Sequence, residues 1–151
     1  MSQHLVIETA DAVVAQINAS TLIPGGLPSG DLLPAQRSYR PQFDLSELKT
    51  CRISVVPKAI VISGLARTSN QHDCSVDIAI QKKLTNADAA ELDPLLLLVQ
   101  QIADLLRLSR LTAMPTALWV KTENNPIYAL EHLENQRVFT SLLTVTYRVM
   151  R

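Results

Sequence analysis

The feature that most constrains this chain is a run of thirteen residues near its end, residues 138–150, whose side chains alternate with a period of two. Phe139, Ser141, Leu143, Val145, Tyr147 and Val149 fall on one side, and Thr140, Leu142, Thr144, Thr146, Arg148 and Met150 on the other. This period predicts one β-strand with one face in the core. At about 3.3 Å per residue it spans about 40 Å, so we expect its end to project beyond neighbouring strands and invite a partner.

Two long helices and a hairpin are predicted upstream of that strand. Apolar residues at positions 6, 10, 13 and 17 indicate an amphipathic helix over His4–Ala19. Alternation over 51–64 and 74–81 predicts two antiparallel strands joined by a tip at 65–72. Asp93-Pro94 suits a helix start because Asp can cap and Pro needs no backbone partner there, and an apolar stripe continues to Leu108.

The remaining segments read as loops and short elements. Clustered Pro and Gly predict a long irregular loop over residues 20–36. We expect a short strand over 37–43, a helical turn over 44–48 capped by its Asp, a strand over 117–121 and a turn at 124–126. The order predicts an α+β fold, with a mainly antiparallel β-sheet, two longer α-helices packed on one face, a protruding hairpin and a long C-terminal strand.

Composition favours an assembling protein over a nucleic-acid binder or a membrane protein. The 151 residues suit one domain, 1–151, and 14 basic residues balance 14 acidic ones, so no global field attracts DNA or a membrane. Charged residues make up only 19% against 47% hydrophobic, which suggests that apolar surface is buried against other subunits. The longest apolar stretch, residues 94–99, is too short to cross a bilayer, and we expect a soluble protein that is not exported.

The sequence offers little chemistry. His4, His72 and His132 lack the spacing that brings metal ligands together, so no metal is expected. His72-Asp73-Cys74 holds a base, a carboxylate and a thiol, but Asp73 faces away from the other two on a strand. We interpret Cys74 and Cys51 as reduced core residues. No catalytic residue or cofactor site is predicted.

Other polar or aromatic groups have ordinary structural interpretations. Residues 24–26 and 28–30 lack the strand, helix and Lys of a phosphate loop, and the acidic residues 88 and 91 suit a helix start. Lys82-Lys83 with Arg67 could form a local basic spot, which is more simply a solvated hairpin end. Trp119 and Tyr147 are expected to be core or interface anchors.

Three phrases together resemble a known family. They are the runs Ser69–Lys83 (SNQHDCSVDIAIQKK), Leu92–Leu106 (LDPLLLLVQQIADLL) and Phe139–Arg148 (FTSLLTVTYR). Over residues 37–151 the chain resembles the tail terminators of tailed bacteriophages, also called tail completion or tail-to-head joining proteins. The phrases are structural and contain no active-site motif.

The resemblance implies a structural virion protein of the viral tail or neck, assembled in the host cytoplasm. It implies a homo-hexameric ring that caps the tail-tube protein, ends its polymerisation and joins the tube to the head connector, with DNA passing through the channel. It implies no catalytic residues and no cofactors. The loop at 20–36 has no clear counterpart in the family.

The candidate subunit contacts are the hairpin tip and the end of the last strand, because we expect both to be exposed. A heterologous ring needs two different patches on each subunit. We expect them to be supplied by the tip residues Arg67, Thr68, Ser69, Asn70, Gln71 and His72, and by the strand-end residues Tyr147, Arg148, Val149, Met150 and Arg151.

Three alternatives remain open at this level. A neck or head-completion protein would bind the connector and not the tube, and a tail-tube subunit would also use sheet-based hexameric rings. A small hydrolase or transferase using Cys74 with His72 belongs to a different class.

Overall fold

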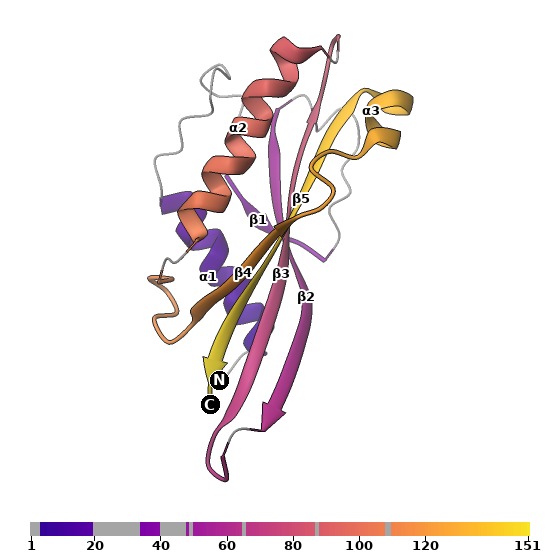
Figure 1. The fold of residues 1–151 in the computed structure, drawn as a ribbon. Coiled ribbons are helices and arrows are strands. Elements are labelled where there is room, and N and C mark those ends of the chain that lie inside the picture. Colours follow the sequence, from indigo (N-terminus) through magenta and orange to yellow (C-terminus); the bar gives the residue numbers. More distant parts are fainter. Residues whose placement is uncertain are drawn as a thin grey trace.

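Three helices and five strands make up the described part of the chain. The computed structural model describes residues 4–19, 34–39, 48, 50–64, 66–86, 88–107 and 110–151. The elements follow the order α1 (Leu5–Ala19), β1 (Gln36–Arg37), β2 (Arg52–Gly64), β3 (Asn70–Lys83), α2 (Ala89–Leu106), β4 (Leu118–Asn124), α3 (Leu130–Gln136) and β5 (Val138–Met150). Figure 1 shows α1 and α2 on the same side of one twisted sheet, which confirms the predicted α+β fold.

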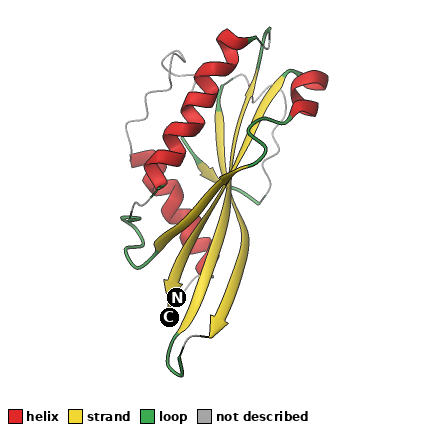
Figure 2. Ribbon diagram, in the orientation of Figure 1, coloured by secondary structure: helices red, strands yellow, loops and turns green. Residues whose placement is uncertain are grey.

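The five strands form a single sheet in the order β1-β2-β3-β5-β4. Only β1 runs parallel to its neighbour, and it pairs with β2 at Ser54 and Val55 alone. The other three pairings are antiparallel, so the predicted hairpin and the long C-terminal strand are both confirmed. Figure 2 shows the β2–β3 hairpin running out beyond the layer of helices.

Strand β5 has the predicted two faces but not the predicted projecting end. Its inward residues from Phe139 to Val149 are all buried, as the period of two requires. It is an interior strand, however, and β3 pairs with it as far as Met150. Arg151 then exchanges two backbone hydrogen bonds with Asn70, of 2.7 and 2.8 Å. The prediction that the end of β5 projects beyond its neighbours is therefore wrong, and the element that projects is the β2–β3 hairpin.

Helix α1 is as predicted, whereas both ends of α2 differ from expectation. Asp88 caps α2, its Oδ1 accepting from the backbone N–H of Glu91 at 3.2 Å, and the helix begins at Ala89 and not at Asp93-Pro94. Pro94 lies inside the helix, in its second turn, where it removes one N–H donor of the helical hydrogen bonds. The helix ends at Leu106, before the predicted Leu108, with Arg107 as its C-cap.

Several shorter predictions also shift. The hairpin tip is shorter than 65–72 because β3 begins at Asn70. Strand β1 starts at Gln36, inside the predicted 20–36 loop, and ends at Arg37, while residues 20–33 and 40–47 lie outside the described residues. Strand β4 covers 118–124 and not 117–121. Helix α3 was not predicted, because none of its side chains is buried and no apolar period marks it.

The core lies between the sheet and the two long helices. It is built from the buried side of α1, the apolar stripe of α2 and the inward residues of β2, β3 and β5. Both cysteines are free and fully buried within it, as predicted. Among the described residues, Tyr147 is the largest fully buried side chain, and its hydroxyl donates to the carbonyl of Leu106 at 3.4 Å, which joins β5 to the end of α2. Burial raises the pKa of this hydroxyl.

Replacing Tyr147 should therefore cost stability. Tyr147→Ala removes a large buried ring and leaves a cavity, so the free energy of unfolding should fall by about 3–5 kcal/mol in urea titrations followed by circular dichroism. Met150→Ala, on the same strand but 48% exposed, is the matched control and should change it by about 0.5 kcal/mol or less. Equal losses for the two variants would contradict the placement of Tyr147 in the core.

Candidate subunit interface

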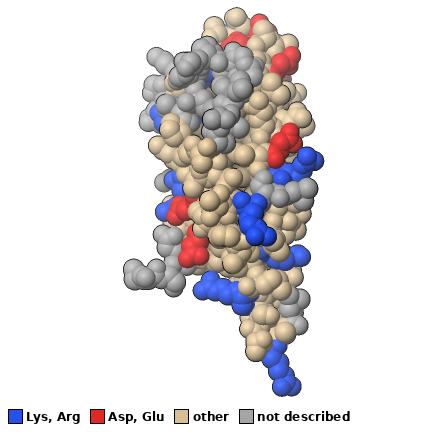
Figure 3. All heavy atoms as spheres, turned by 90° about the vertical axis from the view of Figure 1, so that its left-hand side faces the viewer, with Lys and Arg blue, Asp and Glu red and all other residues tan. Residues whose placement is uncertain are grey.

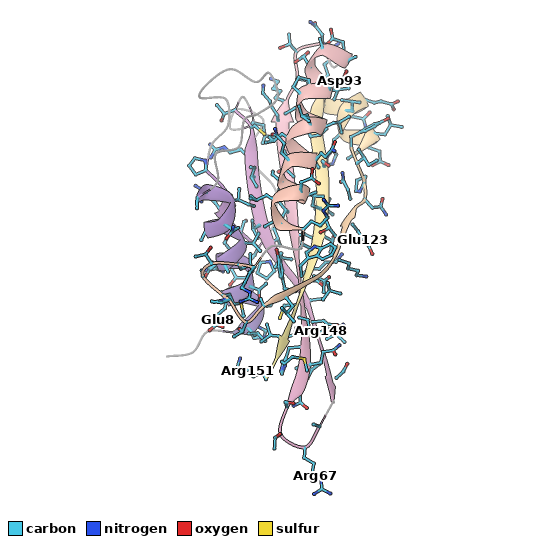
Figure 4. All side chains as sticks on the ribbon, turned by 60° about the vertical axis from the view of Figure 1, so that its left-hand side comes forward. Glu8, Arg67, Asp93, Glu123, Arg148 and Arg151 are labelled. Atoms are coloured by element: carbon cyan, nitrogen blue, oxygen red, sulfur yellow. The ribbon has the colours of Figure 1, made fainter. Side chains whose placement is uncertain are left out.

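The two segments predicted as subunit contacts lie side by side at one end of the sheet. Gln71 pairs with Met150 and His72 with Val149 in the β3–β5 ladder, and Asn70 bonds to Arg151. Figure 4 shows Arg67 at the hairpin tip, with Arg148 and Arg151 nearer the hairpin's base. The end of β5 therefore flanks the base of the projecting hairpin.

This juxtaposition turns two expected patches into one. A heterologous ring contact still requires a second, different surface, which must lie elsewhere on the subunit. Within the patch, Tyr147 and Val149 are buried in the subunit, while Arg67, Met150 and Arg151 are exposed. The side chains that can meet a partner at this end are thus those of the tip and of the last two residues.

A row of cross-strand polar pairs occupies the sheet face opposite the helices. Arg148 donates to Asp73 through Nε at 2.9 Å and Nη2 at 3.3 Å. The hydrogen bond from Arg148 holds the pKa of the Asp73 carboxyl below its ordinary value, and Asp73 in turn raises the pKa of Arg148. Further along, the hydroxyls of Ser75 and Thr146 lie 2.9 Å apart. These pairs lock β3 to β5 in one register.

The distal half of β2, in the projecting hairpin, is largely exposed. Beyond Pro57, the residues of β2 are exposed or half-buried, and Val61 and Ile62 each show 59% of their surface to solvent. In the view of Figure 3, basic side chains reach the narrow end of the molecule, and most of the visible surface is neither acidic nor basic. A projecting strand pair with exposed apolar residues on both faces is suited to contact another protein.

A second surface, missed by sequence reasoning, lies on the other side of the molecule. An open groove of about 580 Å³ runs between α2 and β4, and its lining is mostly apolar. Leu96, Val99 and Ala103 supply the helix wall, facing Trp119 and Leu143 of the sheet. Trp119 donates from Nε1 to the Thr122 hydroxyl at 2.8 Å, which fixes the ring against the groove. The expected anchor role of Trp119 was the only signal that pointed here.

The possible nucleophile does not have the surroundings of one. Cys74 is fully buried, and burial raises the pKa of its thiol, so the reactive thiolate is disfavoured. Asp73 lies on the opposite face, as the strand geometry predicted, and it binds Arg148 there. Among the described residues, no group of three His, Cys, Asp or Glu side chains is placed to hold a metal ion. The geometry gives no support to the enzyme alternative.

The possible basic spot of Lys82, Lys83 and Arg67 does not form. Lys82 and Lys83 end strand β3, whereas Arg67 lies beyond its start, so about 40 Å of strand separates them. Arg137 comes to the two lysines in its place, and together they line an open cleft of about 470 Å³. Arg137 donates there to the Thr85 carbonyl at 3.0 Å.

Comparison with known proteins finds the same fold in a chain of low sequence identity. No protein-family model matches the chain, and no curated protein matches it. Among solved structures, it is similar to a chain of the virion of a native gene transfer agent particle, with a TM-score of 0.63 and 14% identity. The match covers 99% of this chain and 100% of that chain, so the two share one architecture throughout.

In the described part of the chain, no helix is long and apolar enough to cross a membrane.

The Asp73–Arg148 pair should make stability depend on acid pH. Because the folded pKa of Asp73 is lowered, its contribution is present above the unfolded value of about 3.9 and is lost as pH falls through the folded pKa. Asp73→Asn should therefore have a lower free energy of unfolding than wild type at pH 7. In urea titrations at several pH values, this difference should shrink as the pH falls into the acid range. Glu134→Gln, an exposed change on α3, is the control. A constant difference between Asp73→Asn and wild type across this range would contradict the pairing.

Proposed function

We propose that this protein is a structural component of a phage-like virion, a ring-forming tail terminator. It caps the tail tube, ends the polymerisation of the tube protein and joins the tube to the head connector. The observation that carries this proposal is the shared architecture with a chain of a gene transfer agent virion, end to end in both chains. The resemblance of three sequence phrases to tail terminators selects the role within that class.

Physical features of the chain support an assembling subunit. The surface is lean in charge, the hairpin presents exposed Val61 and Ile62, and an apolar groove lies open beside α2. Such surfaces are costly for a lone soluble domain and useful in an assembly. The proposed assembly is a homo-hexamer in the tail or neck region, formed in the host cytoplasm without a cofactor.

The balanced charge is consistent with a DNA conduit. A ring that strongly attracted phosphates would hold DNA in place, because each neutralised phosphate adds to affinity. With 14 basic and 14 acidic residues, the chain has no net charge with which to do so. DNA would pass through the channel with no sequence-specific contact.

The patch formed by 67–72 and 148–151 is proposed to meet the adjoining ring of the virion. It lies at one extreme end of the sheet, where the hairpin projects beyond the helices. In the proposed assembly the strands lie along the axis of the stack, so that this end faces the next ring and the two sheet edges face neighbouring subunits. The tube protein and the connector protein are the two candidate neighbours at this patch.

Purified protein tests the role directly. Light scattering should show a discrete ring near six subunits that does not grow with concentration, and adding it to polymerising tube protein should cap the tubes at one end in negative stain. Unlimited stacking of the protein alone would identify a tube subunit, and binding to the connector but not to tubes would identify a neck protein. A protein that stays monomeric and caps nothing would contradict the proposal.

A variant that lacks the exposed charges of this patch separates capping from ring formation. Arg67→Ala with Arg151→Ala removes the two exposed cations of the patch and leaves the core untouched. We expect rings of normal size that cap tubes with reduced affinity, measured as the fraction of capped ends. Lys83→Ala, an exposed change at the other end of β3, is the control and should cap normally.

A further inference from the structure

We propose that neighbouring subunits join by extending one β-sheet: the outer edge of β2 in one copy pairs with the outer edge of β4 in the next. This inference rests on the proposed ring and names the contact that closes it. It commits to a second copy of this chain as the partner.

Both edges are open in the described part of the chain. Strand β1 covers β2 only at Ser54 and Val55, with one more bond from the Ser38 N–H to the Val55 carbonyl. From Val56 to Gly64, no described strand pairs with the outer side of β2. Strand β4 is the last strand at the opposite side of the sheet. Unpaired backbone groups at such edges are ready to pair with another chain.

The two open edges stand at the same height across the sheet. Following the register, Val61 pairs with Asp73, Asp73 with Arg148, and Arg148 with Leu118. One row away, Ile60 is joined through Cys74 and Tyr147 to Trp119. At the other end, Val56 is joined through Asp77 and Thr144 to Glu123. The open segment 56–61 of β2 is therefore level with 118–123 of β4.

Matching height suits a flat ring. Rotation about an axis along the strands does not move a residue along that axis. It therefore brings each residue of β2 opposite the β4 residue of the same cross-strand row in the next copy. It also keeps strand directions, and β2 runs opposite to β4 in the sheet, so the new pair would be antiparallel. The edges lie on opposite sides of one subunit and cannot pair with each other within it, which makes the contact head-to-tail.

The side chains at these edges match on both faces. On the helix face, Ile60 would lie opposite Trp119, beside the apolar groove under α2, with Ile62 also on this face. On the other face, Val61 would lie opposite Leu118, and these two residues are 59% and 51% exposed in the single subunit. Pairing would bury apolar surface on both faces at once, which is the main gain of cross-strand contacts.

The charges at the edges are complementary as well. Lys58, at the irregularity in β2, reaches Asp77 at 3.7 Å, and the row of Asp77 ends at Glu123 on β4. In the single subunit, Glu123 pairs with Lys121 of its own strand at 3.2 Å, and both side chains are about 60% exposed. In the ring, Lys58 of one copy would meet Glu123 of the next. Lysines on edge strands can also prevent pairing with other chains. Cross-linking distinguishes an edge that is kept unpaired from one that pairs with the next copy.

Engineered cysteines test the contact. In Val61→Cys/Leu118→Cys, cross-strand neighbours in the joined sheet come within disulfide distance, so mild oxidation should give a ladder of covalent oligomers up to the ring on non-reducing gels. The native thiols are buried and stay out of the reaction. Val61→Cys/Met150→Cys is the control, because Met150 is exposed but lies on the interior strand β5, and it should stay uncrosslinked.

Opposite charges provide an independent test, in which light scattering measures the concentration needed for assembly. Val61→Lys alone and Leu118→Asp alone each place a charge in the apolar contact, and each should raise the concentration needed for assembly by more than about tenfold. The double variant Val61→Lys/Leu118→Asp pairs the two charges between copies and should recover most of the loss.

The outcomes separate this inference from the proposed function. Rings in light scattering with no cross-linking of Val61→Cys/Leu118→Cys, and no rescue in the double charge variant, would overturn the edge contact while leaving the ring role standing. Wild-type protein that forms no ring, alone or on tubes, would overturn the proposed function itself. Cross-linking of the control pair at the same rate would mark the ladder as random collision and overturn the inference.

Discussion

The structure depends on strand β3 being paired along both sides. Of its fourteen residues, 70–81 pair with β2 on one side and 71–83 pair with β5 on the other, so three long strands share one register. That register puts the buried apolar residues of all three on the side that α1 and α2 cover, and the Asp73–Arg148 and Asp77–Thr144 contacts on the other. A slip of one residue would bury carboxylates and expose the core, so the core and the polar face hold each other in place.

Local patterns in the sequence were sufficient for much of this fold. Period-two alternation identified β2, β3 and β5, and the spacing of Val6, Ala10, Val13 and Ile17 identified α1. These signals work because each is decided by burial on one face of a single element. The start of α2 was wrong because Asp88 is also a good cap, and the choice between two caps depends on the packing of the first turn.

The candidate interface could be predicted only in part, because it depends on contacts distant in sequence. The exposed hairpin tip and the last residues were identified, but their adjacency comes from the Asn70–Arg151 pairing, which no local pattern contains. The long alternation suggested an edge, whereas β5 became an interior strand when β4 took its outer side. The level rows that link Val61 to Leu118 likewise exist only after four strands have been aligned.

The two buried thiols give the subunit an internal reporter of its own opening. Cys51 lies just before β2, and Cys74 lies in the middle of β3 beneath α1, both without exposed surface. A thiol reagent can reach them only when the sheet separates from its helices, so the labelling rate measures how often that happens. Comparing this rate in free subunits with that in assembled particles would reveal how much of the rigidity of the protein belongs to the chain and how much is conferred by its neighbours.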